Sequence, residues 1–454
     1  MNINTLMFKE YDIRATYPEE INENVAYIIG KSYGTYLQKY FNYNKCVVGY
    51  DNRLSGPSLH QELIKGLLET GINVIDYGMV TTPMHYLTRY KENCPGITIT
   101  ASHNPKDDNG FKFSFDHQTN ARGEMIRNFR DFTLKGSFIE GQGILEHRSI
   151  KKDYLNFMKK NIDLGTKPLK VVVDPGNGVT TTICKEVFSL FPSIDVTYIC
   201  DENDGTFPNH HPDPAVESNL TMLKESVIET KADLGIAYDG DGDRVGFIDN
   251  KGLYVPADTF MYIISKYLMP FLKNKTILYD LKCSKALEDE IIRLGGIPLC
   301  YRTGTSYTEA KVKEDNIEFG GEYSGHIFFQ DRDVTIGCGI YAGLRMCEVL
   351  SKSNETMNEL YQDMNHYYKT PEIKIKTSNE LKFDIIDKVL EYVKNKQYNY
   401  MNIDGVKVLY PFGWALIRAS NTGPDITIRF EAETEEQLNK IQEEFTNLVN
   451  NYIA

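Results

Sequence analysis

One pattern occurs three times in this chain: a short apolar strand that ends at an aspartate, a loop of small residues, a helix and a second strand. The three strands run into Asp51, Asp174 and Asp280, which lie 123 and 106 residues apart (174 minus 51, and 280 minus 174). A strand, a helix and a strand in quick succession predict parallel βαβ units. Separations of this size are those of whole domains rather than of solenoid repeats. The sequence therefore predicts three α/β domains of similar design.

The C-terminal part follows another pattern, in which short strands pair as hairpins between helices, and this predicts an α+β domain. Thr434 and Gln437 at the start of the last helix fit a capping box. The predicted fold class is thus α/β, with three similar mixed α/β domains plus a C-terminal α+β domain. We expect the domains to span residues 1–149, 150–252, 253–368 and 369–454.

Composition and charge exclude several classes of protein. The chain has 454 residues, 41% of them apolar and 25% charged, as in ordinary globular proteins. It contains no apolar run of about 18 residues, and its first 15 residues do not fit a secretory signal, so we expect a cytoplasmic protein with no membrane partner. The net charge of −13 argues against nucleic acid as a partner. Eight cysteines without a Cys-x-x-Cys pair are interpreted as buried free thiols.

Ser102 follows a predicted strand and precedes a turn. Apolar and polar residues alternate over residues 97–100, which predicts a strand, and Asn104-Pro105 indicates the turn. A serine at the carboxyl end of a parallel strand can act as a nucleophile if a neighbour activates it, and His103 and Lys112 are the nearest titratable candidates. The alternative is that the Ser-His pair only stabilises the turn.

Three carboxylates alternate with glycines directly after the apolar strand 234–238, at Asp239, Asp241 and Asp243. Alternate side chains of an extended segment point to one side, so these groups would repel one another unless a cation binds between them. Three carboxylate ligands would leave a coordination position open for a phosphate oxygen, and such an all-oxygen site favours Mg²⁺ as the bound cation. An EF-hand is excluded because its sixth and twelfth positions would be Arg244 and Asn250. A solvated acidic turn is the alternative interpretation.

Two further loops carry polar side chains among glycines. The segment from Arg418 to Gly423 contains a guanidinium group that can donate two parallel hydrogen bonds, followed by short neutral side chains that can also donate. Such a set of donors can bind a phosphate group. The alternative interpretation is an ordinary polar turn. The loop 320–326 contains Glu322, Ser324 and His326, and a carboxylate there can accept hydrogen bonds from neighbouring sugar hydroxyls. Glu322 could equally cap a helix.

These motifs, in this order, resemble the α-D-phosphohexomutase superfamily, and its bacterial phosphomannomutase/phosphoglucomutase branch in particular. The resemblance spans nearly the whole chain and places one loop in each predicted domain. It rests on residues 8–14, 100–105, 109–112, 207–214, 239–244, 280–283, 321–326 and 413–422.

The resemblance implies four domains around a central active-site cleft and a phosphohexomutase that interconverts hexose 1-phosphate and hexose 6-phosphate. Ser102 would be the phosphoserine and, with Asp239, Asp241 and Asp243, would ligate Mg²⁺; a hexose 1,6-bisphosphate would be activator and intermediate. Lys112, His326, Arg14 and His103 are the other catalytic candidates. Sugar-phosphate binding is expected from Tyr11, Arg244, Lys282, Thr305, Glu322, Ser324, Arg418, Ser420, Asn421 and Thr422. We expect a monomer or weak homo-oligomer whose partner is a small-molecule sugar phosphate.

The chain departs from the family pattern at several positions. Thr305 stands where the family usually has a histidine, and Glu309 stands where it has a lysine, with Lys311 two residues further on. Tyr323 occupies a position where methionine is more typical of the branch. The sequence Gly-Cys-Gly at 337–339 replaces a usual pair of acidic residues. We expect Thr305 and Glu309 to lie where sugar or phosphate is contacted, so the preferred sugar stays open. The alternatives are a phosphoglucosamine or other sugar-phosphate mutase, a phosphatase, or a non-catalytic phosphosugar-binding protein.

Overall fold

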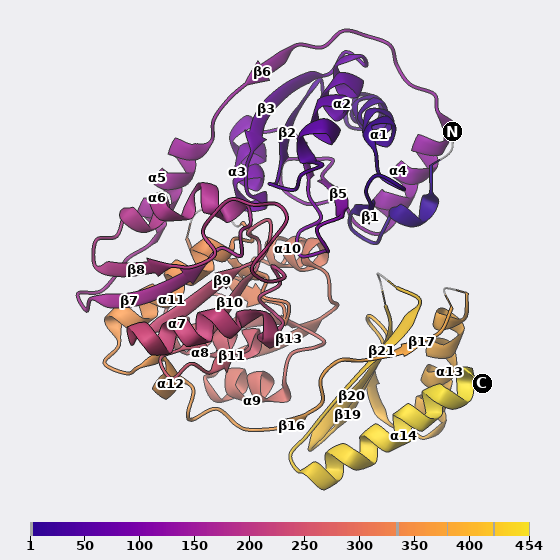
Figure 1. Cartoon of the computed structure of the whole chain (residues 1–454). Helices are drawn as coiled ribbons and strands as arrows, with labels where there is room; N and C mark the ends of the chain where they lie inside the picture. The colour runs from indigo at the N-terminus through magenta and orange to yellow at the C-terminus, as the bar shows by residue number, and fades with distance from the viewer. Residues whose placement is uncertain (1–2, 333–335, 379, 421–422, 454) are drawn as a thin grey trace.

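Four β-sheets follow one another along the chain in the computed structural model, which describes residues 3–332, 336–378, 380–420 and 423–453 (Figure 1). The first three sheets carry helices on their faces and the fourth is antiparallel, as the predicted fold class requires. Within the described residues no helix is long and apolar enough to cross a membrane.

The first sheet is mixed and is covered by helices on both faces. Cys46 and Val48 point to the face covered by α1, α2 and α4, whereas Val47 points to the face covered by α3, because side chains alternate along a strand. In spatial order its strands are β1 (Ile13–Thr16), β5 (Asp108–Phe113), β4 (Gly96–Ile99), β2 (Lys45–Tyr50), β3 (Asn73–Met79) and β6 (Leu145–His147). Its helices are α1 (Glu23–Tyr36), α2 (Gly56–Leu68), α3 (Thr82–Glu92) and α4 (Glu124–Lys135).

The second and third sheets repeat a core of parallel strands followed by one antiparallel strand. The second contains β11 (Tyr254–Val255), β10 (Val245–Asp249), β9 (Leu234–Tyr238), β7 (Leu169–Asp174) and β8 (Ile194–Tyr198), with α5 (Lys151–Asn161), α6 (Cys184–Ser189) and α7 (Thr221–Thr230). The third contains β13 (Ile297–Tyr301), β12 (Thr276–Asp280), β14 (Phe319–Gly321) and β15 (Ile327–Phe329), with α8 (Ala257–Leu268), α9 (Lys285–Arg293), α10 (Thr305–Glu314), α11 (Gly339–Lys352) and α12 (Met357–Leu360).

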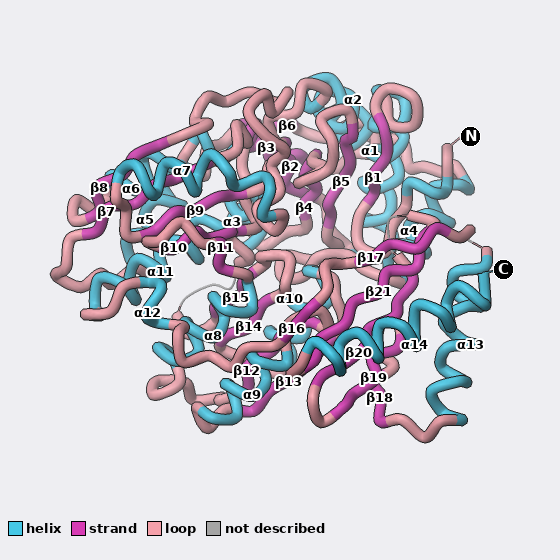
Figure 2. Tube along the Cα trace, turned by 60° about the horizontal axis from the view of Figure 1, so that its bottom comes forward, coloured by secondary structure: helices cyan, strands magenta, loops and turns pink. Residues whose placement is uncertain are grey.

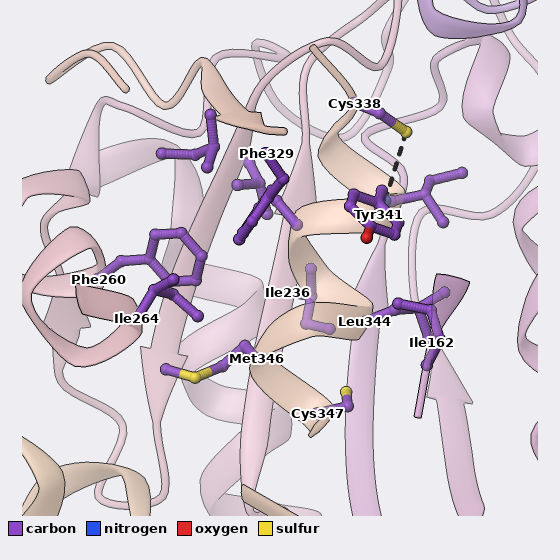
Figure 3. Packing of buried hydrophobic residues seen from close by; sticks show 14 of the residues in the cluster. Ile162, Ile236, Phe260, Ile264, Phe329, Cys338, Tyr341, Leu344, Met346 and Cys347 are labelled. Atoms are coloured by element: carbon purple, nitrogen blue, oxygen red, sulfur yellow. Dashed lines mark hydrogen bonds between the residues drawn. The ribbon is translucent and has the colours of Figure 1, made fainter. Parts of the chain in front are cut away.

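Helix α11 follows the third sheet in sequence but packs against the second sheet as well. Figure 3 shows Leu344 near Ile162 of the second domain, while Met346 lies near Phe260 and Ile264 of α8. Gly343 permits the close approach, because a Cβ atom there would lie 3.1 Å from side-chain atoms of β9. The second and third domains therefore share one hydrophobic core, which the sequence pattern did not predict.

The C-terminal sheet lies across from the first domain and carries two helices on one face (Figures 1 and 2). The capping box predicted for its last helix is confirmed: the Gln437 backbone N–H donates to Thr434 Oγ1, and the Thr434 N–H donates to Gln437 Oε1. The strands are β16 (Tyr368–Lys369), β17 (Ile373–Lys376), β18 (Asn399–Met401), β19 (Val406–Tyr410), β20 (Gly413–Ala419) and β21 (Asp425–Ala432), and the helices are α13 (Leu381–Asn395) and α14 (Glu435–Ile453).

All four loops singled out by the sequence occupy the same kind of position, the connection between two adjacent antiparallel strands. The Ser102 loop joins β4 to β5, the aspartate loop joins β9 to β10, and the Glu322 loop joins β14 to β15. In the last sheet Arg418 lies near the end of β20, and the loop that begins at Ser420 joins β20 to β21. Four chemically different loops thus occupy equivalent points, three of them in the repeated α/β domains and one in the C-terminal sheet.

Candidate active site

A cleft of about 890 Å³ lies between the four domains. Two of the predicted residues, Asn421 and Thr422, lie outside the described part of the chain. Ser102 and the three aspartates are at most 1% exposed and lie beneath the surface of the cleft. The predicted residues that line it are Tyr11, Arg14, His103, Lys112, Arg244, Lys282, Thr305, Glu322, Ser324, His326, Arg418 and Ser420.

Ser102 is held against the aspartate loop. Its Oγ donates a hydrogen bond of 2.7 Å to Asp239 Oδ2, and its backbone N–H donates to Thr100 Oγ1 at 2.8 Å. His103 Nδ1 lies 3.2 Å from the same Oγ. The φ angle of Ser102 is +52°, a left-handed conformation that costs energy for a residue with a Cβ atom. The turn therefore aims the hydroxyl at the carboxylates.

Arg53, which the sequence analysis did not single out, stabilises this turn through hydrogen bonds to its backbone. Its guanidinium is buried and donates to the backbone carbonyls of Ser102, Asn104 and Pro105 at 2.6–2.8 Å. Asp51, at the end of the first repeated strand, accepts from the Arg53 backbone N–H at 2.9 Å. The first of the three repeated aspartates thus positions the arginine that holds the serine loop. In the sequence, an arginine two residues after this aspartate was the signal that could have indicated the role of Arg53.

The aspartate loop is a tight turn rather than the extended segment expected from the sequence. Asp239 Oδ1 accepts from the backbone N–H groups of Gly242 and Arg244, both at 3.0 Å, which bends the loop back on itself. The ligand oxygens of Asp239, Asp241 and Asp243 nevertheless lie within 4.8 Å of one another. Asp241 Oδ1 is buried and has no hydrogen-bond partner among the described residues. Convergent carboxylates with an unpaired oxygen fit a hard divalent cation.

Neighbouring charges and burial act differently on the individual carboxylates. Lys112 Nζ contacts Asp241 Oδ2 at 2.7 Å and Asp243 Oδ2 at 2.6 Å. Burial, together with the charges of Asp241 and Asp243, raises the pKa of Asp239 well above its usual range. Burial would also raise the pKa of Asp243, but Lys112 and His326 outweigh it and hold that pKa well below its usual range. A divalent cation bound at these oxygens would favour the charged form of Asp239.

Glu322 caps a helix, which was the alternative considered for it, and it also faces the cleft. Its Oε1 accepts from the Gly304 N–H at 2.9 Å and from Thr308 Oγ1 at 2.6 Å, at the start of α10. Its Oε2 lies 3.2 Å from Ser324 Oγ and from His326 Nδ1. A ligand hydroxyl would meet a carboxylate whose orientation is already fixed.

His326 connects the Glu322 loop to the aspartate loop. Its Nδ1 lies 2.9 Å from Ser324 Oγ and its Nε2 lies 3.2 Å from Asp243 Oδ1. Burial opposes a charge on the ring, but Asp243 and Glu322 together raise the pKa of His326 above its ordinary value. The imidazole is therefore poised to hold a proton between the two loops.

Arg418 of the C-terminal domain and Lys282 of the third domain are cations that line the cleft. Arg418 donates to Asp404 at 2.8 Å, and Lys282 lies 3.3 Å from Glu372. Lys382, which the sequence analysis missed, is buried and donates to the backbone carbonyl of Ser420 at 2.9 Å. A lysine inside an amphipathic helix gives no sequence signal of this role.

The expectation that Glu309 contacts the ligand is wrong. Thr305 lines the cleft, but Glu309 lies one helical turn further along α10 and is 1% exposed. Its carboxylate accepts from Asn120 Nδ2 at 2.9 Å and pairs with Lys313 at 2.7 Å. The change to glutamate therefore serves the contact between the first and third domains.

We expect Glu309→Ala to lower the free energy of unfolding by about 2 kcal/mol, because it removes the acceptor of the buried Asn120 amide and the carboxylate that pairs with Lys313. The measurement is urea denaturation. Lys311→Ala is the matched control: its pair with Asp315 is exposed and should contribute less than about 0.5 kcal/mol. Equal effects of the two substitutions would contradict the assigned contact.

A serine hydroxyl beside three carboxylates, below a cleft with cationic walls from four domains, defines a multidomain α/β enzyme that acts on an anionic substrate. Four family descriptions match consecutive parts of this chain. Phosphoglucomutase/phosphomannomutase, alpha/beta/alpha domain I matches residues 5–139; domains II and III match residues 152–252 and 256–367; and the C-terminal domain matches residues 372–448. The chain belongs to the phosphoglucomutase/phosphomannomutase family.

Individual relatives are similar over almost their full length. A phosphomannomutase/phosphoglucomutase of Pseudomonas aeruginosa is 38% identical over 97% of this chain and 95% of its own. A phosphoglucomutase of Neisseria meningitidis is 33% identical over 99% of this chain and 97% of its own. The crystal structure of a phosphoglucomutase/phosphomannomutase family protein from Burkholderia thailandensis has a TM-score of 0.91 at 33% identity and covers 99% of this chain and 98% of that one.

Proposed function

We propose that this enzyme, an isomerase of the intramolecular phosphotransferase kind, interconverts hexose 1-phosphate and hexose 6-phosphate, with mannose or glucose as the sugar. The observation that carries the proposal is the 2.7 Å hydrogen bond from Ser102 Oγ to Asp239 in a buried carboxylate cluster, directly below the cleft. Sugar phosphates are its partners, the cytoplasm is its setting, and the assembly is a monomer or weak homo-oligomer.

Ser102 carries the phosphoryl group in this proposal. Asp239, Asp241 and Asp243, with an oxygen on Ser102, would hold Mg²⁺, which when bound supplies stabilisation of negative charge during phosphoryl transfer. The unpaired Asp241 oxygen and the all-oxygen ligand set support this choice of ion.

Transfer from phospho-Ser102 breaks the bond between phosphorus and Oγ and forms a bond between phosphorus and a free sugar hydroxyl. The hydroxyl proton must leave the sugar, and Ser102 Oγ must gain a proton as its bond to phosphorus breaks. Lys112, His326 and Arg14 are the candidates for proton transfer and charge stabilisation. Arg14 donates to the Ala101 carbonyl at 3.0 Å, so its guanidinium is already placed at the serine loop. The product of this step is a hexose 1,6-bisphosphate.

The bisphosphate then turns end for end, and Ser102 Oγ takes the other phosphoryl group, which regenerates the phosphoserine. Both orientations must therefore fit one cleft. Glu322 and Ser324 would bind the sugar's O3 and O4, which lie midway between C1 and C6 and occupy similar places in either orientation. Arg418, Ser420 and the neighbouring Asn421 and Thr422 would bind the phosphate that is not reacting.

Glucose and mannose 1-phosphates should both be substrates, with kcat/KM values within about 10³-fold of each other. The two sugars differ at C2, away from the proposed Glu322 and Ser324 contacts, and a site that does not hydrogen-bond that hydroxyl discriminates weakly. Coupled mutase kinetics with both substrates and with glucosamine phosphate test this, while inorganic phosphate is followed to detect a phosphatase.

A larger difference in kcat/KM between the two sugar phosphates would show that a residue of the cleft forms a hydrogen bond with the C2 hydroxyl. Thr305, which lines the cleft at the start of α10, is then the first residue to test. Recovery of the poorer substrate by Thr305→His would place the specificity there. Absence of mutase turnover with every sugar phosphate would overturn the proposed function.

A further inference from the structure

The second domain contains a group of potential metal ligands that the proposed reaction does not use. It consists of Asp174 at the end of β7, Cys200 just after β8, and His210 in the loop that leads to α7. One ligand atom from each lies within 4.8 Å of the other two. Among the described residues, only this group and the active-site aspartates meet that condition.

The side chains of Asp174 and His210 are each held so that one ligand atom faces the cluster. His210 Nδ1 lies 3.0 Å from the His211 carbonyl, an arrangement in which Nδ1–H donates to the backbone, and Nε2 lies 3.0 Å from Asp174 Oδ2. Asp174 Oδ1 accepts from the Gly176 N–H at 2.8 Å, which leaves Oδ2 for the cluster. A backbone acceptor on one histidine nitrogen orients the other nitrogen in metal sites.

The same geometry argues against a cysteine–histidine–aspartate relay. In a relay the histidine uses two different nitrogens, one for the nucleophile and one for the carboxylate. Here Nδ1 faces the His211 carbonyl, so a single nitrogen, Nε2, remains for the aspartate and the cysteine. The three groups converge on one point, as metal ligands do.

We propose that Asp174, Cys200 and His210 form a second metal site, for a soft or borderline divalent cation of the Zn²⁺ type. One thiolate, one imidazole and one carboxylate are ligands that Zn²⁺ accepts in tetrahedral geometry, with a fourth position for water. The thiolate and carboxylate together neutralise the charge of the ion. Cys200 and His210 are partly exposed, so an ion can reach them.

The site lies behind the wall of the substrate cleft. The loop that supplies His210 continues to Asp213, which lines the cleft and lies 3.7 Å from Arg244. A bound ion would tie this loop to the ends of β7 and β8 and so stiffen that wall. The site differs from the active-site aspartates in containing a thiolate, and this difference makes it separately observable.

Cobalt is the spectroscopic probe, added to the full-length enzyme in saturating Mg²⁺. We expect Co²⁺ to give a thiolate-to-metal charge-transfer band that Zn²⁺ removes, because only the second site offers sulfur. Cys200→Ser should abolish the band, and Cys200→Ser and His210→Asn should each weaken Zn²⁺ binding by at least about 100-fold. Cys300→Ser is the matched control, a half-buried cysteine outside the cluster, and should keep the band.

A second measurement needs no variant, in case His210→Asn fails to fold. Zn²⁺ should protect Cys200 of the wild-type enzyme from alkylation, mapped by peptide mass, and leave Cys300 unaffected. Absence of a thiolate band, or a band that survives in Cys200→Ser, overturns the proposal. Equal alkylation of Cys200 with and without Zn²⁺ overturns it as well, and leaves the histidine–aspartate ion pair as the role of these residues.

Discussion

Ser102→Ala is expected to lower mutase turnover on the order of 10⁴-fold or more, because the covalent carrier of the phosphoryl group is lost. The fold should persist, since the substitution removes only the side-chain contacts of Oγ with Asp239 at 2.7 Å and with His103 at 3.2 Å, and loss of such a buried hydrogen bond costs about 1–3 kcal/mol. Coupled kinetics give the turnover and circular dichroism gives the fold. Intact-mass analysis should detect a phosphoryl adduct on the wild type and none on the variant.

Ser58→Ala is the matched control for this experiment. Its hydroxyl donates to the Ser55 carbonyl on α2, outside the cleft, so activity and phosphorylation should be unchanged. Near-normal turnover in Ser102→Ala, or an adduct that persists in it, would show that another residue carries the phosphoryl group.

Removal of divalent metal by EDTA and dialysis should lower turnover by about 10³-fold or more, and Mg²⁺ should restore it. Charge stabilisation by a bound ion contributes several kcal/mol to such a transfer, and about 4 kcal/mol corresponds to 10³-fold. Without the ion, Lys112 is the cation in direct hydrogen-bond contact with Asp241 and Asp243. The measurement is turnover before and after addition of Mg²⁺.

The Cys200→Ser variant separates the two metal sites in that experiment. It lacks the sulfur ligand of the second site and keeps all three active-site aspartates, so its dependence on Mg²⁺ should match the wild type. Full activity of the dialysed wild-type enzyme in excess EDTA would be incompatible with a magnesium centre at the aspartates.

Much of the architecture follows from the sequence, because short-range pattern and chain order determine it. The repeated strand and aspartate predict three βαβ-based domains, and the fold class is confirmed. Ser102 and Asp239 are each predicted to follow a strand, and they lie in the loops directly after β4 and β9 of two different sheets. The roles assigned to the site residues and the domain boundaries stay predictions.

The parts that the sequence did not predict depend on contacts between segments that lie far apart in the chain. Arg53 appears as one polar residue in a small loop, and only the folded chain brings the serine turn over its guanidinium. Thr305 and Glu309 occupy one helix, but a rise of about 6 Å over four residues carries the second from the cleft to the contact with the first domain. The spacing of apolar residues in a sequence shows which face of a helix is buried, but it does not show which other part of the chain packs against that face.

The position of α11 bears on how the chain is made. The second sheet is complete at Val255, but the helix that covers part of one face ends at Lys352. A ribosome that adds roughly 5–20 residues per second therefore leaves Ile236 and its apolar neighbours exposed for about 5–20 seconds. During synthesis the nascent second domain is a natural substrate for chaperones, and any fragment that ends before residue 339 should be retained by them or aggregate.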